Sequence, residues 1–478
     1  MTTADRWRRH VRRLPWPADT EAAFAALFGA GGPSAPAGDV FWLDSSRPGD
    51  GTARYSYLGA GVPGRAVTSD DGPVLDRLAR RLREVEVVGA PSPVPFGGGF
   101  VGYLGHEARH ECGHPVRHRA PTPDAVWARV DRLVAVDHRE AATHLVALVP
   151  DGDPPPTGWF DTTAATLASL RPLPGPPPAS PVGADQVAAV LAVDRERYLA
   201  DVRRCLVHLR EGDSYEICLT TQAAVPVVEE GLTVHRRLRR ANPAPYGAYV
   251  RLGGVEIACA SPERFLHVTA DGVVETRPIK GTAPRGASRS EDDALAAALA
   301  ADTKTRAENL MVVDLLRNDL HRVCEPGSVA VPRLMAVERH ATVHQLVTTV
   351  SGRLRAGLGA VDALRACFPG GSMTGAPKHR TLEILDRIEG RTRGVYSGAL
   401  GWLGLDGAAD LAIVIRTAVG HRGTWRVGAG GGIVLDSDPA AEYEEMLLKA
   451  AVPLQALLAS QTAPGPAPRR GRPVRAAP

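Results

Sequence analysis

The stretch Thr276-Arg277-Pro278-Ile279-Lys280-Gly281-Thr282 places one lysine in a short apolar turn after the strand-like run 272–275. Lysine is rare in this chain: the 56 basic residues are 52 arginines and the lysines at positions 280, 304, 378 and 449. Arginine does not lose its proton in proteins, whereas a desolvated lysine can become neutral and act as a nucleophile or base. We therefore expect chemistry at Lys280. An ordinary solvated lysine beside a turn is the alternative.

Two strand-like segments carry carboxylates where a plain core would carry apolar side chains. Residues 215–222 alternate with period two, which places Glu216 on the face opposite the larger apolar side chains. Residues 257–265 bring a second strand to Glu263. A half-buried glutamate there would have a raised pKa and could serve as a general acid. A salt bridge to its neighbour Arg264 is an equally open interpretation.

Two amphipathic segments predict helices that carry further carboxylates. Residues 302–320 read as one long helix that contains Glu308. Residues 440–449 read as a second helix, with Glu442 and Glu445 three positions apart on one face. Glutamates from two helices that face each other across a cleft could hold a hard dication such as Mg²⁺. Charged helix faces exposed to solvent are the alternative.

Two glycine-rich segments are predicted to form loops. Residues 368–378 resemble a phosphate-binding loop, but Ala-Pro separates Gly375 from Lys378, so the Gly-Lys-Ser/Thr pattern is absent. Residues 428–434 could present bare backbone N–H groups to an anion. With Arg416 nearby, whose guanidinium offers two parallel donors, they would form a carboxylate pocket. Tight turns between strands are the alternative for both segments.

Composition excludes several classes of function. The net charge of +3 is small and spread along the chain, which argues against a nucleic-acid-binding protein. No apolar run approaches the roughly 20 residues that span a membrane, and the N-terminus lacks the apolar core of a signal peptide. Six scattered cysteines without a Cys-x-x-Cys pair predict reduced thiols in a cytoplasmic protein. The histidine-rich segment 106–118 fits no standard zinc spacing and favours a solvated loop over a metal site.

Breaks in composition predict the organisation of the chain. The region 1–170 includes a segment, 74–88, with apolar residues at helical spacing. A proline-rich linker at 171–189 separates it from a larger region at 190–458. The Pro/Ala/Arg tail at 459–478 has little apolar surface to offset its ordering entropy, so we expect it to be disordered.

A series of segments occurs in an order typical of one enzyme family. They are SYEICLTTQ (214–222), NPAPYGAYVRL (242–252), SPERF (261–265), RPIKGT (277–282), AENLMVVDLLRNDL (307–320), FPGGSMTGAPK (368–378), RGVYSGALGWL (393–403), IVIRTA (413–418), GAGGGIV (428–434) and EYEEMLLKA (442–450). Together they resemble the chorismate-utilising enzymes, strongly over residues 190–455 and more loosely before them. The resemblance implies an α+β fold in which two large antiparallel sheets pack against each other and are surrounded by helices.

Within that family, Lys280 favours amination of chorismate at C4, which gives 4-amino-4-deoxychorismate, the precursor of p-aminobenzoate. Members that aminate C2, to anthranilate or 2-amino-2-deoxyisochorismate, usually carry a small residue there and represent the alternative. Members that use water carry a basic lysine where Glu216 stands, and a carboxylate cannot act in the same way. A non-catalytic scaffold subunit is the alternative outside the enzymes, and the presence of Lys280, Glu263, Glu308 and Glu445 argues against it.

The resemblance implies a role for each matching residue. Lys280 would attack C2 while Glu263 protonates the departing C4 hydroxyl, and ammonia would then attack C4 and expel Lys280. In a dry cleft, desolvation would favour a neutral Lys280 and a protonated Glu263. Mg²⁺ would be held by Glu308 and Glu445, with Glu442 in support. The residues implied to bind the substrate are Arg416, Tyr396, Gly430, Gly431, Lys449, Thr282, His344, Thr374 and Glu216.

The resemblance also implies partners. No cysteine lies in a Gly-x-Cys-x-Gly setting, so ammonia would come from a separate glutamine amidotransferase subunit. Leu43, Asp44 and Ser45 lie where relatives bind tryptophan, either as a regulator or as a fixed structural ligand. Thr305 stands where the family commonly has an acidic residue, which removes one carboxylate from the surroundings of the metal.

Overall fold

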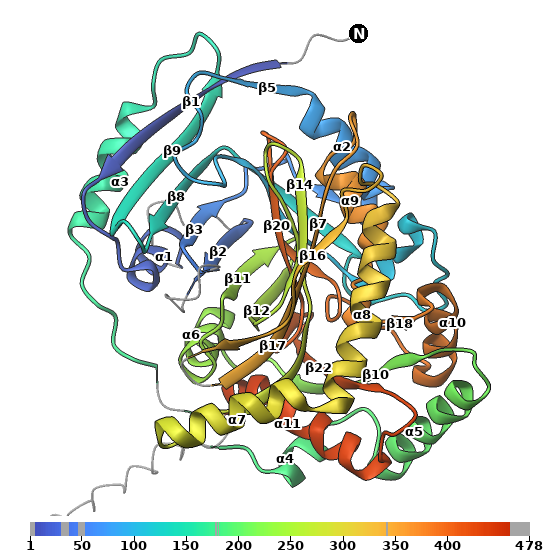
Figure 1. The fold of residues 1–478 in the computed structure, drawn as a ribbon. Helices are drawn as coiled ribbons and strands as arrows, with labels where there is room; N and C mark the ends of the chain where they lie inside the picture. Colours follow the sequence, from blue (N-terminus) through green and yellow to red (C-terminus); the bar gives the residue numbers. More distant parts are fainter. Residues whose placement is uncertain are drawn as a thin grey trace, which may run out of the picture.

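Two large β-sheets and the helices that cover them make up the computed structural model, which describes residues 5–29, 38–45, 53–176, 179, 181–340 and 343–458 (Figure 1). This arrangement confirms the expected α+β class. The tail predicted to be disordered lies outside the described residues. Each sheet combines strands from before and after the proline-rich segment 171–189.

The first sheet has twelve strands, and neighbouring strands are antiparallel except for the parallel pair β1 and β5. Its strands in spatial order are β18 (Gly375–Ala376), β10 (Glu216–Pro226), β22 (Thr424–Ile433), β21 (Thr417–His421), β12 (Val255–Ser261), β11 (Tyr246–Leu252), β2 (Val40–Asp44), β3 (Tyr55–Ala60), β8 (Arg132–Asp137), β9 (Ala142–Pro150), β1 (Asp5–Leu14) and β5 (Val85–Val88).

The second sheet has ten strands and is antiparallel in every pairing of the described residues. Its path is β15 (Ile279–Pro284), β17 (Val343–Arg353), β14 (Val273–Arg277), β13 (Arg264–Val268), β20 (Ala409–Ile413), β19 (Ala399–Gly404), β6 (Gly99–Leu104), β7 (Ala125–Val130) and β4 (Val67–Thr68), with β16 (Ala330–Arg339) also paired to β17.

The two sheets share a hydrophobic core between their inner faces. Phe41 and Val250 of the first sheet belong to the same buried cluster as Val101 and Trp402 of the second. Strands that are buried on both faces read as apolar runs rather than as alternating patterns. Both faces of β10 are buried at its start, although it carries the polar residues Glu216, Thr220 and Thr221.

Helices cover the outer faces. The first sheet is covered near its N-terminal strands by α1 (Thr20–Phe28) and α3 (Thr157–Ala168), and near β10 and β22 by α4 (Ala184–Ala188), α5 (Arg195–Arg210), α6 (Gly231–Ala241), α10 (Lys378–Glu389) and α11 (Pro439–Leu458). The second sheet is covered by α2 (Val74–Arg83), α8 (Thr303–His321) and α9 (Ala360–Cys367). The remaining helices are α7 (Arg289–Ala301), η1 (Ser69–Asp71), η2 (His106–Cys112) and η3 (Gly371–Met373).

Three local predictions differ from the structure. The helix predicted over 74–88 ends at Arg83, because the valine-rich residues that follow pair with β1 as β5. The glycine run 428–434 is largely part of strand β22 rather than a loop. The first part of the histidine-rich segment forms η2, in which His106 and Cys112 are buried, whereas residues 113–118 form a partly exposed loop, so the expected solvated loop is confined to the second part.

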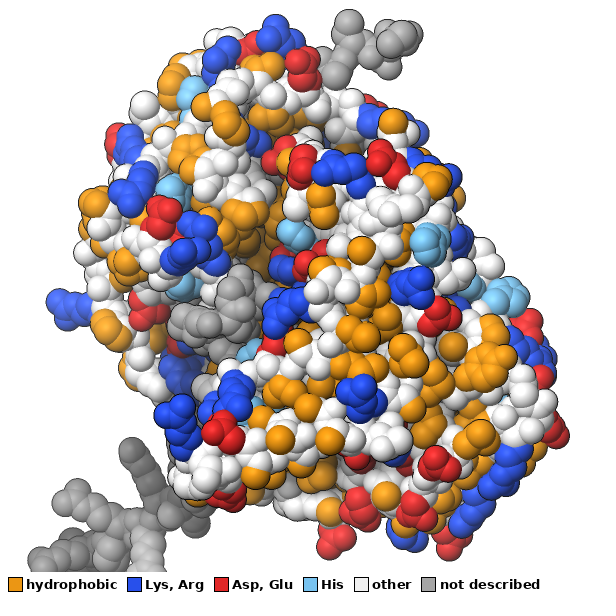
Figure 2. Space-filling view, viewed as in Figure 1, with side chains coloured by type: hydrophobic (Ala, Val, Ile, Leu, Met, Phe, Trp, Pro, Cys, Tyr) orange, Lys and Arg blue, Asp and Glu red, His pale blue; other side chains and the backbone are white. Residues whose placement is uncertain are grey.

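Basic and acidic side chains are interspersed on the face drawn in Figure 2, without one stripe of a single sign. This distribution agrees with the small net charge of +3. No helix within the described part of the chain combines the length and apolar character that crossing a membrane requires.

Candidate active site

A cleft of about 630 Å³ opens where β10, β15 and β22 meet the helices α8 and α11. Its size is in the range that takes a small organic ligand. Most of the residues predicted from the sequence line this cleft, although they come from seven separate segments of the chain. They are Glu263, Lys280, Thr282, Glu308, Tyr396, Arg416, Gly430, Gly431, Glu445 and Lys449.

Lys280 lies in β15 and forms a buried ion pair with Glu216, the first residue of β10. Lys280 Nζ lies 2.5 Å from Glu216 Oε1. Burial alone would lower the pKa of Lys280, but the charges of Glu216 and Glu308 outweigh it and raise this pKa. The resting lysine is therefore a cation, which corrects the expectation of a neutral Lys280.

Glu263 lies just before β13 and is 6% exposed. Burial raises the pKa of Glu263 to about 7, while hydrogen bonds from the Ser372 side chain and the Ile279 backbone limit the rise. Its neighbour Arg264 pairs with Asp410 and Glu275 instead. The salt-bridge interpretation is therefore excluded, and Glu263 has the environment of a general acid.

Arg416 and Tyr396 form the wall opposite α8. Arg416 lies between β20 and β21 with φ of 51°, in the left-handed region that a non-glycine residue seldom adopts. Within the described part of the chain, no hydrogen bond or ion pair reaches its guanidinium, which lines the cleft. A Cβ atom on Gly428 would lie 2.2 Å from the ring of Tyr396, so this position in β22 must be glycine for the tyrosine to pack there.

The predicted metal ligands lie on α8 and α11. Glu308 and Glu445 line the cleft, and Glu442 is buried and accepts hydrogen bonds from Ser437 at 2.6 Å and from Lys304 at 3.2 Å. Two carboxylates line a polar cleft, and a third is buried on the same helix as Glu445. Carboxylate oxygens are the ligands that Mg²⁺ prefers, so the residue types fit the ion. The same carboxylates are paired with lysines, because Lys449 lies 2.7 Å from Glu445 and Lys304 lies 3.8 Å from Glu308.

A close group of potential metal-ligand atoms is found outside the cleft. Within the described ranges, the one set of three His, Cys, Asp or Glu ligand atoms that all approach one another is His208, Glu211 and Asp213, outside the cleft. Asp213 also pairs with Arg380.

Some predicted substrate ligands do not line the cleft. His344 is fully buried, with Nε2 2.8 Å from Asp292 Oδ1. The Thr374 hydroxyl lies 3.3 Å from the carbonyl oxygens of Gly370 and Gly371. His344 bonds to a residue of α7 and Thr374 to the turn at Gly370 and Gly371, so neither makes the contact with substrate that was expected from the sequence. Glu216 likewise lies behind Lys280 rather than on the cleft wall.

Sequence reasoning missed four polar residues of the cleft, Asp302, Lys304, Gln345 and Ser372. A signal for Lys304 was present, because it is one of only four lysines in the chain. Ser372 and Gln345 are residue types common on any surface, and nothing in their spacing marks them.

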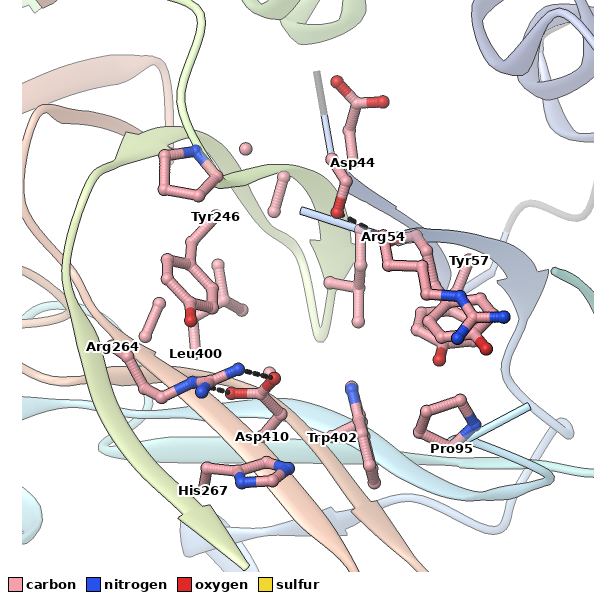
Figure 3. A pocket seen from close by; sticks show the side chains of 18 residues that line it. Asp44, Arg54, Tyr57, Pro95, Tyr246, Arg264, His267, Leu400, Trp402 and Asp410 are labelled. Carbon is pink, nitrogen blue, oxygen red and sulfur yellow. Dashed lines mark hydrogen bonds and ion pairs between the residues drawn. The ribbon is translucent and has the colours of Figure 1, made fainter. Parts of the chain in front are cut away.

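A second cavity of about 320 Å³ lies between the two sheets, with Leu43, Asp44 and Ser45 of the predicted tryptophan site among its lining residues (Figure 3). Its walls combine aromatic side chains such as Tyr57 and Trp402 with the ion pair of Arg264 and Asp410. Asp44 turns its carboxylate out of the cavity to Arg239 at 2.7 Å. The lining residues are Leu43, Asp44, Ser45, Arg54, Tyr55, Tyr57, Pro95, Pro245, Tyr246, Gly247, Ala248, Arg264, His267, Leu400, Gly401, Trp402, Asp410 and Ala412.

The chorismate binding enzyme family matches residues 40–455, which include both cavities. The chain belongs to this family. Among curated relatives, this chorismate binding enzyme is 45% identical to an aminodeoxychorismate synthase of Streptomyces pristinaespiralis, over 94% of the chain and 65% of that relative. It therefore spans less than two thirds of that relative's length. It is also 41% identical to an anthranilate synthase component 1 of Streptomyces coelicolor, over 92% of the chain and 87% of that relative.

Among solved structures, the chorismate binding enzyme superposes on anthranilate synthase component I from Streptococcus pneumoniae. The TM-score is 0.68 at 28% identity, and the match covers 93% of this chain and 92% of that one. The similarity extends over the described sheets and helices and accords with the fold that the sequence motifs implied.

Proposed function

We propose that this chain aminates chorismate at C4 with ammonia and releases 4-amino-4-deoxychorismate, the precursor of p-aminobenzoate. One observation carries the proposal: a buried lysine, Lys280, and a buried glutamate with a raised pKa, Glu263, line the same cleft. The greater identity to an aminodeoxychorismate synthase, 45% against 41% for an anthranilate synthase component, supports C4 over C2 amination.

Lys280, Glu263 and Arg416 would each have a separate role in the reaction. The Lys280 nitrogen attacks C2 of the ring, the ring double bonds shift, and the C4–O bond breaks. Glu263 donates its proton to the departing hydroxyl, which leaves as water. Ammonia then attacks C4, the double bonds shift back, and the bond from C2 to Lys280 breaks. Arg416, which lacks a partner within the described residues, would hold a substrate carboxylate with its two parallel donors.

Glu308 and Glu445 would hold Mg²⁺, with Glu442 behind them. A bound Mg²⁺ supplies positive charge that fixes and neutralises a substrate carboxylate. Lys304 and Lys449 neutralise the same glutamates in this structure and would move aside or share them. We accordingly expect turnover to require Mg²⁺ and to be abolished by a chelator.

Ammonia would come from a separate glutamine amidotransferase. All six cysteines are buried and unpaired, and burial raises the pKa of their thiols, for example to about 12 for Cys112 and to about 11 for Cys259. A thiol nucleophile needs a lowered pKa and access to solvent, so none of these cysteines suits glutamine hydrolysis. The second cavity, with its aromatic walls, would bind tryptophan between the sheets.

The test is product analysis. Purified protein is supplied with chorismate, Mg²⁺ and excess ammonium, with and without an aminodeoxychorismate lyase. The products are separated and identified by mass spectrometry. We expect p-aminobenzoate only when the lyase is present, and loss of turnover in Lys280→Ala. Anthranilate, or an aminated product that the lyase ignores, would mean amination at C2 and would overturn the proposal.

A further inference from the structure

The charged groups of Glu216 and Lys280 pair with each other and are largely shielded from solvent. The Glu216 side chain is 2% exposed and the Lys280 side chain 11%, and no other hydrogen bond among the described residues reaches either charged group. A Cβ atom on Gly432 of β22 would lie 2.7 Å from Glu216 Oε1 and 3.4 Å from Lys280 Nζ. Strands β10, β15 and β22 thus build a tight compartment for one carboxylate and one ammonium.

A protonated lysine has no lone pair and cannot attack carbon. From the geometry we infer that Glu216 is the base that accepts a proton from Lys280 before the attack and returns it after the lysine departs. This inference rests on the proposed function, in which Lys280 is the nucleophile. It gives Glu216 a catalytic role in place of the substrate-binding role expected from the sequence.

The charged groups around the pair point to the same assignment. Glu308 of α8 and Glu445 of α11 act on Lys280 through their charges, without a hydrogen bond or ion pair to it in the described part of the chain. Glu263 carries the proton needed at C4, so it cannot also accept one. Cys218, also near Lys280, is a buried thiol with a raised pKa. Among the residues that the structure describes, Glu216 is the one acceptor in hydrogen-bond contact with the lysine nitrogen.

Each proton that is transferred during the reaction is returned by the end of one catalytic cycle. Lys280 gives a proton to Glu216, and the ion pair becomes a neutral amine and a carboxylic acid. Burial favours this transfer, because the neutral pair avoids the desolvation cost of two charges, whereas the attraction between the charges opposes it. The amine forms the C2–N bond, and the electron pair of the C4–O bond leaves with the hydroxyl. When ammonia displaces Lys280, the lysine departs as a neutral amine and recovers its proton from Glu216. The nitrogen that arrives at C4 carries three protons, and the loss of one of them restores the proton that Glu263 gave to the departing hydroxyl.

Substitution of Glu216 tests the inference with ammonium as nitrogen source. Glu216→Gln keeps the shape of the side chain but cannot accept the proton. Glu216→Ala leaves room for a small carboxylate. Lys280→Ala tests the nucleophile itself. Glu444→Gln is the matched control, because it removes one carboxylate from the exposed face of α11, outside the cleft. Both kcat and KM for chorismate are measured for each variant, with and without added formate.

We expect Glu216→Gln to lower kcat by about 10²- to 10⁴-fold, the usual contribution of a general base, while KM for chorismate changes little. Formate should restore turnover to Glu216→Ala in a saturable manner, which would also show that this variant is folded. Glu444→Gln should match the wild type.

Three results would overturn the inference. The first is near wild-type kcat in Glu216→Gln, and the second is a raised KM with unchanged kcat, which would indicate substrate binding only. The third is a Glu216→Ala variant that binds chorismate but does not respond to formate. Full turnover by Lys280→Ala would instead remove the nucleophile, and then the proposed function would fail together with the need for a base.

Discussion

The four lysines of the chain each contact a carboxylate. Lys280 pairs with Glu216, Lys304 with Glu442, and Lys449 with Glu445 in or beside the cleft. Lys378 pairs with Asp319 in the core under α10. Three of the four lysines therefore lie in or beside the candidate site, so the scarcity of lysine in the sequence was a useful indicator of its position. It did not predict the protonation state of Lys280, because that depends on which carboxylate lies beside it in space.

At the residue scale, the raised pKa of Glu263 predicts a pH dependence. The group is an acid in the proposed reaction, so its protonated form is the active one. That form predominates below a pKa of about 7 and is lost as pH rises through it. We expect kcat/KM for chorismate to fall above this pH by about tenfold per unit, since the protonated fraction falls in that proportion.

The measurement holds the concentration of free ammonia constant across the pH series. Glu263→Gln, whose side chain does not titrate, should turn over about 10²- to 10⁴-fold more slowly and without this alkaline limb. An alkaline limb that persists in Glu263→Gln would assign it to another group and refute the role of Glu263 as the acid.

At the element scale, β22 accounts for the difference between the predicted glycine loop and the observed strand. Gly428 admits the ring of Tyr396, and Gly432 admits the Glu216–Lys280 pair. A glycine-rich run is compatible with either a turn or a strand approached closely by side chains. The sequence alone could not separate these cases, because the approaching residues lie far away along the chain.

A buried ion pair joins several elements behind the cleft. Glu389 at the end of α10 accepts hydrogen bonds from the guanidinium of Arg393 at 2.6 Å and from the backbone N–H of Thr220 in β10 at 2.9 Å. Arg393 in turn donates to the carbonyl oxygens of Met373 and Cys218. These contacts hold β10, η3 and α10 in fixed positions around the cleft.

We expect Glu389→Ala to lower the free energy of unfolding by about 3–5 kcal/mol, because it leaves the buried charge of Arg393 unpaired. Urea unfolding followed by circular dichroism would measure the change. Glu444→Gln serves as the control and should shift the free energy by no more than about 0.5 kcal/mol. A loss below about 1 kcal/mol in Glu389→Ala would mean that water or other groups take over the role of the carboxylate.

At the scale of the whole molecule, the sequence predicted the fold class and most of the cleft, and its errors have a common cause. Motifs on β15, α8 and α11 identified residues whose side chains meet in space. Thr374 belongs to the motif at 368–378, yet its hydroxyl faces a pair of carbonyl oxygens, and His344, which lies outside the motifs, pairs with Asp292. Motif membership locates a residue near the site, whereas the direction of its side chain depends on tertiary packing.

The cavity between the sheets supports the last prediction. Its lining comes from β2, β3 and β11 of the first sheet and from β13, β19 and β20 of the second, so a ligand there would contact both sheets at once (Figure 3). A ligand that binds only the folded chain stabilises it, by about 2.7 kcal/mol at one hundred times its Kd. We expect L-tryptophan to raise the melting temperature and to release or absorb heat in calorimetry.

L-Alanine is the matched ligand control, since it carries the same backbone groups without the indole and should leave the melting temperature unchanged. Ala248→Leu would place extra side-chain volume at the cavity wall and should abolish the response to tryptophan while the protein still turns over chorismate. A melting temperature that tryptophan does not move, together with no heat of binding, would remove tryptophan as the ligand. An equal shift in Ala248→Leu would place the binding elsewhere, because the altered cavity could no longer account for it.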